Sequence, residues 1–366
     1  MTTMKAVVKL LTPKEGQRVI AISDIHGNLT IFQKLLEKIG FCKDDLLILV
    51  GDMLEKGPKN LDTLYYIMEL EQTHQVYPLL GNCDTVLLSL TKPQENERLR
   101  NYLMSRRSTI HEMYEKVGRH IDETTDMLEL KEVLCHYYFR EIEWLRDLPH
   151  IIVAGNYYFA HAALKSENFS ENSMQDVINE EAFLKKEHSF SHTIVVGHMP
   201  VMLYDDKICR CNPIFDRKKN IISIDGGNII KTDGQLNALI INDVHSAQVS
   251  YESMDLLRKA IALSSREPIK DQASINVCWS DGAVKVLERG EEFSYCRHCS
   301  SGHELWILND FLSEEQGQTW ADEGTDYILT VKQGEMMSVV KETSRGYLVK
   351  KDGIVGWYDG ALQWLS

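Results

Sequence analysis

Proline and cysteine are scarce in this chain of 366 residues, with 8 of each. So little proline excludes a collagen-like protein, and so few cysteines exclude a disulfide scaffold and indicate reduced thiols, as in a cytoplasm. No run of about eighteen apolar residues occurs, so we expect no membrane-spanning helix. The N-terminus lacks a long apolar core followed by a cleavage site, so we also expect no signal peptide.

Basic residues are also in the minority, since 40 Lys and Arg face 54 Asp and Glu, and the net charge is −14. A protein that binds duplex nucleic acid should carry a basic excess, so this class is disfavoured. A hydrophobic content of 43% with 26% charged residues is typical of a globular protein. The length exceeds that of one ordinary core, which predicts more than one domain.

Short apolar runs of strand length recur in the first 230 residues. Most of them lack polar alternation, which indicates strands that are buried on both faces. Residues 29–40 and 60–71 show helical spacing instead, and they separate the first three runs. Alternating strands and helices predict a layered α/β domain. The six apolar runs span residues 18–23, 46–50, 76–80, 157–160, 193–196 and 221–224.

An Asp, His or Asn follows nearly every one of these runs. A single Asp there is usually a turn residue, and a single His is usually structural. Ligands of buried α/β sheets, however, bind beyond the carboxyl ends of strands, and five or six such ends together favour a site. The residues concerned are Asp24, His26, Asp52, Asn82, His161, His198 and Asp225.

The residue types point to metal ions. Imidazole, carboxylate and amide oxygen suit manganese, iron or zinc better than calcium. Asp52 has two carboxylate oxygens and can bridge two cations, and the neutral Asn82 can serve the second cation. Two ions about 3.5–4 Å apart would clamp a phosphate and generate a hydroxide from water. The pattern therefore predicts a two-metal hydrolase.

Five blocks carry a family resemblance: Asp24-Ile-His26, Gly51–Pro58, Gly81–Asp84, His161-Ala162 and Gly197-His198. In this order they resemble the calcineurin-like metallophosphoesterases, and most closely the phosphoprotein-phosphatase-like branch, which includes symmetrical diadenosine tetraphosphate hydrolases. The resemblance covers about residues 18–240 and implies an α/β (α+β) fold, a four-layer β-sandwich flanked by helices. It implies two divalent ions, with Mn expected first and Fe or Zn as alternatives. The implied ligands are Asp24, His26 and Asp52 for the first ion, and Asp52, Asn82, His161 and His198 for the second.

The third block departs from the family pattern. The family has a His that is thought to protonate the leaving alcohol, assisted by the acid beside it, whereas this chain has Cys83 followed by Asp84. A thiol is the poorer acid, with a reference pKa of ~8.5 against ~6.5. Losing the acid would cost about 10²–10⁴ in rate, and alkyl phosphomonoesters would suffer most. Alternatively, another residue donates the proton.

The second block departs as well. It has Glu55-Lys56 where the protein phosphatases have Asp-Arg. Lys56 can meet a phosphate as a point charge but not bidentately, and Asn82 is the second residue expected at the phosphate. The alternative is that Lys56 is an exposed turn residue.

The chain is expected to divide into four regions. Residues 1–250 form the expected catalytic domain, and the insertion at about 88–148 is predicted to be a helical cap over the metal site. Residues 251–270 are predicted to be a helix or linker. Two β modules, at 271–318 and 319–366, resemble bacterial Src-homology-3-like barrels, which implies contact with a protein partner. In the cap, the candidate substrate contacts are Arg106, Arg107, Arg119 and His111, although a solvated helix face is the alternative.

Together these features predict a cytoplasmic metal-dependent phosphoesterase, whose partner is a phosphorylated protein or a small phosphate ester. A serine/threonine phosphoprotein phosphatase is the first expectation. A symmetrical dinucleoside tetraphosphate hydrolase or a phosphodiesterase is the alternative. A different class, a non-catalytic phosphatase-like scaffold that acts through its β modules, stays open, although the complete set of six ligands argues against it.

Overall fold

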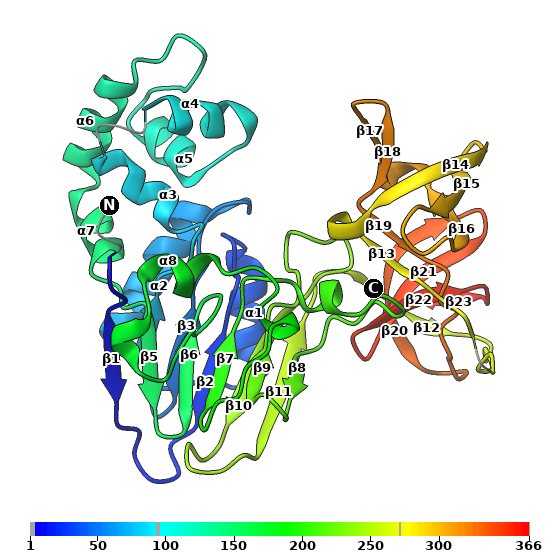
Figure 1. Cartoon of the computed structure of the whole chain (residues 1–366), viewed down its shortest axis with the longest axis horizontal. Coiled ribbons are helices and arrows are strands. Elements are labelled where there is room, and N and C mark those ends of the chain that lie inside the picture. Colours follow the sequence, from blue (N-terminus) through cyan, green and yellow to red (C-terminus); the bar gives the residue numbers. More distant parts are fainter. Residues whose placement is uncertain (1–3, 93–95, 271, 366) are drawn as a thin grey trace. The chain divides into compact units, whose positions relative to one another are not determined.

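The computed structural model describes residues 4–92, 96–270 and 272–365. The chain divides into two compact units (Figure 1). The first consists of Met1–Met199 and Pro213–Met254, and the second of Pro200–Asn212 and Asp255–Ser366. Within the described ranges, no helix has the length and apolar character needed to pass through a bilayer.

Two sheets form the centre of the first unit (Figure 1). The six-stranded sheet has the order β1-β5-β6-β7-β9-β8, and the five-stranded sheet has the order β11-β10-β2-β3-β4. Strands β2, β3 and β4 are parallel, as are β6, β7 and β9. The bounds are Val8–Leu11 (β1), Val19–Ile22 (β2), Leu46–Val50 (β3), Gln75–Leu79 (β4), Ile151–Ala154 (β5), Tyr157–Ala160 (β6), Thr193–Val196 (β7), Ile214–Asp216 (β8), Ile221–Ser223 (β9), Leu236–Ile241 (β10) and Val249–Met254 (β11).

The two sheets pack face to face around one apolar core. Ala21 and Ile48 from the five-stranded sheet share it with Phe159 and Val195 from the other sheet. The opposite face of β2 carries Ile20, which packs in a second core with the helices of this unit. Both faces of β2 are therefore buried. This confirms the prediction that its sequence lacks alternating polar residues because neither face meets solvent.

Helices α1 (Leu29–Lys38) and α2 (Asn60–Thr73) connect the parallel strands β2, β3 and β4, as the spacing predicts. The predicted insertion is also helical, and a short helix, α8 (Met174–Asn179), follows later. Glu112 of the insertion accepts hydrogen bonds from the backbone amides of Asn60 and Leu61, so it fixes the start of α2. Among the described residues, the α-helices between β4 and β5 are Thr85–Leu88 (α3), Asn96–Ser105 (α4), Thr109–Lys116 (α5), Met127–Tyr137 (α6) and Phe139–Arg146 (α7).

The second unit consists of short strands. One five-stranded sheet has the order β16-β15-β14-β18-β17, another has the order β22-β21-β20-β12-β23, and β13 pairs with β19. Each five-stranded sheet has its own small apolar core. The bounds are Arg258–Ala262 (β12), Asn276–Cys278 (β13), Ala283–Arg289 (β14), Phe293–His298 (β15), Glu304–Leu308 (β16), Leu312–Glu315 (β17), Gln318–Ala321 (β18), Glu323–Thr325 (β19), Met336–Thr343 (β20), Gly346–Lys351 (β21), Ile354–Tyr358 (β22) and Leu362–Trp364 (β23).

The prediction of a helix or linker at 251–270 is wrong for the first half of this range, because β11 and β12 lie there. Leu256, Leu257, Ala260 and Ile261 are spaced as on one face of a helix, which explains the error. Ala260 instead pairs with Met337 and Trp364, partners that are distant in sequence. Local periodicity cannot report such pairing.

The boundary expected between 318 and 319 also differs from the structure. It falls within the β17–β18 hairpin, so β18 and β19 belong with the first small module. Strand β12 precedes that module in sequence but belongs to the sheet of the second one. The second module is therefore assembled from two separate segments of the chain.

Candidate active site

The predicted metal ligands come from both sheets of the first unit. Asp24 and His26 follow β2, Asp52 follows β3, and Asn82 follows β4. His161 follows β6 and His198 follows β7, in the six-stranded sheet. Because these strands run parallel within each sheet, their carboxyl ends bring the six side chains to one region.

Close contacts link the six residues into a closed ring. His26 Nε2 lies 3.7 Å from Asp24 Oδ1 and 3.9 Å from Asp52 Oδ2. Asp52 Oδ1 lies 3.3 Å from His161 Nε2. Asn82 Oδ1 is 3.0 Å from His161 Nε2 and 2.9 Å from His198 Nδ1. The backbone amide of His198 donates to Asp24 Oδ2 at 3.0 Å and closes the ring.

The backbone of the site is strained. Of the eleven non-glycine residues with positive φ in the described chain, six belong to the site or its loops. Left-handed backbone costs energy in residues that have a Cβ atom, and it persists where the surrounding structure enforces it. Such clustering is typical of functional sites. The six residues are Asp24, His26, Asp52, Glu55, Lys56 and His198.

Two glycines allow the acids to approach closely. A Cβ atom on Gly81 would lie 2.1 Å from the amide nitrogen of Asp52 and 2.3 Å from Asp52 Oδ1. A Cβ atom on Gly197 would lie 2.3 Å from Asp24 Oδ2. The two carboxylates therefore occupy space that the side chain of any larger residue at position 81 or 197 would fill.

Opposite charges stabilise the centre of the ring. Burial alone would raise the pKa of Asp52, but His161, His26 and Lys56 lower it well below its usual value. Burial would lower the pKa of His161, yet the Asp52 carboxylate raises it to about 10. Asp24 is different, because burial and the neighbouring Asp225 raise its pKa well above the usual value.

The remaining two histidines are held neutral. Burial lowers the pKa of His26 to about 3, with a further contribution from Lys56. Burial and His161 lower the pKa of His198 to about 4. His26 Nδ1 faces the Leu54 carbonyl at 3.4 Å, and His161 Nδ1 faces the Val50 carbonyl at 2.9 Å. A carbonyl only accepts, so each Nδ1 carries the hydrogen and each Nε2 is directed to the site.

These donors fit a pair of cations. The ligand atoms of His26, Asp52 and Cys83 all lie within 4.8 Å of one another. The same holds for a second group, the ligand atoms of Asp52, His161 and His198. Asp52 belongs to both, as a bridging carboxylate must. Asp24 Oδ1 is buried without a hydrogen-bond partner, which is costly unless a further group satisfies it. The donor set of imidazoles, carboxylates and an amide oxygen is therefore suited to divalent transition metals.

The Asp84 carboxylate is held by two backbone amides in this structure. Its two carboxylate oxygens accept from the amides of Leu54, at 3.1 Å, and Gly81, at 2.9 Å. Burial and Asp52 raise the pKa of Asp84 to about 7. The side chain thus ties the loop after β3 to the loop after β4. The neighbouring Cys83 amide donates to Asp52 Oδ1 at 2.8 Å.

Two buried acids have contacts or surroundings to which the sequence assigned no metal or substrate role. Asp225, after β9, has an oxygen without a hydrogen-bond partner, and burial raises its pKa to about 6. Its position at a strand end, like that of the predicted ligands, was the available signal. Glu55 is 1% exposed and accepts from Tyr102 OH, Ser108 Oγ and the Thr109 amide, at 2.9–3.0 Å. It joins the Lys56 loop to the helical insertion.

The polar candidates of the insertion have structural partners, which favours the alternative of a solvated helix face. Arg107 pairs with Glu115, and Arg119 pairs with Glu129. The Arg106 guanidinium lies 5.1 Å from the centre of the Tyr102 ring. His111 Nδ1 accepts from the Ser108 amide in a capping box. By contrast, Lys56 Nζ lies 3.5 Å from His26 Nε2, at the metal-site residues.

Residues 17–221 match the family described as calcineurin-like phosphoesterase, so the chain belongs to that family. It is 31% identical over 147 residues to the symmetrical bis(5'-nucleosyl)-tetraphosphatase of Aromatoleum aromaticum, a match that covers 40% of this chain and 44% of that protein. The enzyme of that name from Ectopseudomonas mendocina is 32% identical over 125 residues, covering 34% and 42%. The chain thus spans less than half the length of these curated relatives.

Among solved structures, the chain is similar to a protein serine/threonine phosphatase from Saccharomyces cerevisiae. The sequence identity is 11% and the TM-score is 0.42. The match covers 69% of this chain and 85% of the yeast chain.

Proposed function

We propose that this protein is a two-metal phosphohydrolase that cleaves phosphate anhydrides, of the symmetrical dinucleoside tetraphosphate type. Asp24, His26 and Asp52 would hold the first cation. Asp52, Asn82, His161 and His198 would hold the second. When bound, the two cations would activate a water molecule and neutralise phosphate oxygens.

The chain's own residues position the substrate. Desolvation opposes the charge on Lys56, but the acids Cys83, Asp52 and Asp24 raise its pKa, so the ammonium stays protonated. It can therefore meet a phosphate oxygen as a point charge beside His26. Asn82 Oδ1 is directed at His161 and His198, the other proposed ligands of the second cation, and Asn82 Nδ2 donates to Cys83 Sγ at 3.7 Å.

The observation that carries the choice of substrate is the group at position 83. Burial and the Asp52 carboxylate raise the pKa of the Cys83 thiol well above its usual value, and Asp84 is occupied by two backbone amides. A weak, unassisted acid is a poor proton donor to an alcohol. A nucleotide phosphate, which leaves as a stable anion, does not require one. The curated relatives with this activity support the same choice.

The test is a panel of substrates with added Mn²⁺, compared by kcat/KM. It contains P1,P4-diadenosine tetraphosphate, an aryl phosphodiester, and a phosphoserine peptide. We expect the dinucleotide to be the best substrate, with ADP as the sole nucleotide product. A preference of tenfold or more for the phosphopeptide would contradict the proposal and favour the phosphoprotein phosphatase that the Gly51–Pro58 block also predicts.

A protein partner of the second unit remains part of the proposal. The unit has a cavity of about 350 Å³ whose lining includes Phe293, Trp306 and Trp357. The Arg345 guanidinium stacks 3.9 Å from the Trp306 ring. Aromatic residues and arginine are enriched at protein interfaces. We expect the Trp306→Ala variant to lose a partner protein in a pull-down while its hydrolytic activity stays unchanged. A partner that the variant retains would contradict this part of the proposal.

A further inference from the structure

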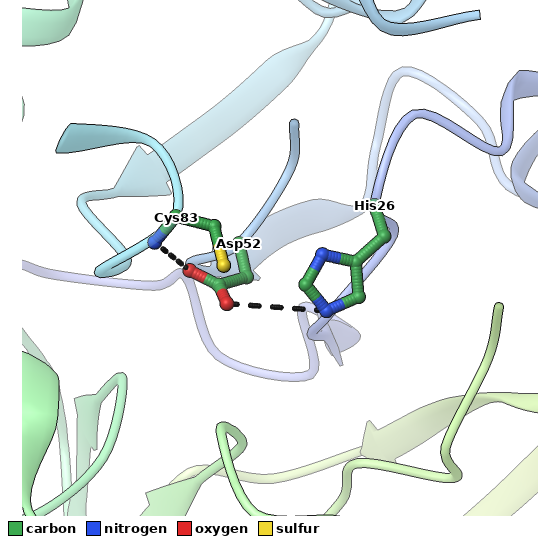
Figure 2. A group of neighbouring side chains, drawn as sticks. All are labelled: His26, Asp52 and Cys83. Carbon is green, nitrogen blue, oxygen red and sulfur yellow. Dashed lines mark hydrogen bonds and ion pairs between the residues drawn. The ribbon is translucent and has the colours of Figure 1, made fainter. Parts of the chain in front are cut away.

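The thiol of Cys83 lies inside the metal-site cluster. Ligand atoms of His26, Asp52 and Cys83 all lie within 4.8 Å of one another. Figure 2 shows the sulfur beside the Asp52 carboxylate, while the His26 ring faces that carboxylate. Cys83 is 7% exposed, so its sulfur is turned into the protein.

We propose that Cys83 Sγ is a ligand of the first cation, together with Asp24, His26 and Asp52, and that this thiolate makes the site selective for zinc. The inference rests on the proposed function, because it concerns the same two-cation centre. It assigns to Cys83 a role other than proton donation.

The spacing permits coordination. A zinc ion is bound at ~2.3 Å by sulfur and at ~2.0–2.2 Å by imidazole nitrogen or carboxylate oxygen. Around a tetrahedral ion with these bond lengths, the ligand atoms are separated by about 3.3–3.7 Å. Atoms within 4.8 Å of one another therefore need to close by at most about 1–1.5 Å to share an ion.

A second observation points to the same ion. Asp24 Oδ1 is fully buried, has no hydrogen-bond partner and lies 3.7 Å from His26 Nε2. With Asp24, the first site has two carboxylates, one imidazole and one sulfur, which is a complete tetrahedral set. As the sulfur–metal bond forms, the thiol proton passes to water, because a coordinating thiol is deprotonated.

The chemistry has a consequence for selectivity. Manganese prefers oxygen and nitrogen ligands, whereas thiolate favours zinc among the divalent ions expected here. The first site should therefore prefer zinc over manganese. The second site has no sulfur in its group, so its preference should stay that of a nitrogen and oxygen site. The centre would then hold two different metals.

Cobalt absorption of the full chain tests the proposal. Metal-free protein is titrated with Co²⁺, which gives visible d–d bands at any protein site and a near-ultraviolet charge-transfer band only with a sulfur ligand. We expect two equivalents to bind and the charge-transfer band to appear with one of them. Cys83→Ser should keep the d–d bands, lose the charge-transfer band and weaken zinc binding at the first site by about 100-fold or more, since loss of even an outer-shell partner costs about 10- to 100-fold. Cys296→Ser, which removes a buried thiol of the second unit that belongs to none of the groups of possible metal ligands among the described residues, is the control and should retain the band.

The outcomes separate the two claims. Two bound cobalt ions with no charge-transfer band, or a band that persists in Cys83→Ser, would overturn the role of Cys83 and leave the two-cation centre intact. Failure to bind cobalt would overturn both. If Cys83→Ser does not fold, zinc-edge X-ray absorption of the unaltered protein decides: the proposal requires a Zn–S distance of ~2.3 Å, and its absence contradicts it.

Discussion

The Ser108 hydroxyl donates a 3.0 Å hydrogen bond to the buried carboxylate of Glu55. This contact connects residues that are 53 positions apart, one in the loop after β3 and one at the start of α5. Glu55 immediately precedes Lys56, and both have a positive φ. The helical insertion thereby holds the loop that carries Lys56, the proposed phosphate contact.

Removing this hydroxyl should destabilise the protein. Ser108→Ala leaves Glu55 with one donor fewer and removes the side-chain cap that accepts from the Ile110 amide. We expect a loss of about 1–2 kcal/mol in the free energy of unfolding, measured by urea denaturation. Ser105→Ala is the control, since that hydroxyl is exposed and bonds only within its own turn. Equal effects of the two variants would contradict the role of Ser108.

Lys56 should contribute to substrate binding but not to metal binding. Lys56→Ala removes the ammonium near His26, so kcat/KM for the dinucleotide should fall by about 100-fold while the metal content stays the same. The matched control is Lys59→Ala, which removes an exposed lysine from the same loop. A change below twofold, or a parallel loss in both variants, would indicate that Lys56 is only a turn residue.

The pH dependence of stability should include a contribution from Glu167. Backbone and side-chain hydrogen bonds from Ser191 and His192 outweigh the effect of burial and lower the pKa of Glu167 from 4.5 to about 2. A lowered carboxyl pKa stabilises the fold above the unfolded pKa, and this stability is lost as the pH falls through the folded pKa.

Glu167→Gln should therefore cost about 1 kcal/mol in unfolding free energy near pH 7, after allowance for solvent screening. The difference from the unaltered protein should shrink between pH 4.5 and pH 2. Glu181→Gln, at an exposed acid, provides the comparison. A cost that does not vary with pH would exclude this ionic contribution.

The site could largely be anticipated from the sequence, because it depends on where strands end. Asp52 and His161 follow apolar runs, and parallel strands bring such ends together. Asp225 also follows a run and belongs to the same set of strand-end residues, although the family resemblance assigned it no metal. The contact between Glu55 and Ser108 could not be foreseen, since two segments joined by packing of the insertion leave no local pattern.

The second unit was harder to predict. Its small sheets are assembled from strands far apart in sequence, as in the pairing of Ala260 with Trp364. Short apolar segments are compatible with either a helix or a strand, and their partners decide between the two. The resemblance to Src-homology-3-like barrels stays a prediction for these modules.

The most direct measurement is a crystal structure of the full chain grown with excess Mn²⁺. We expect two peaks of anomalous density about 3.5–4 Å apart, bridged by Asp52, with Asn82, His161 and His198 on one of them. A structure with no metal among these side chains, or with Asp52 bound to neither ion, would contradict the account.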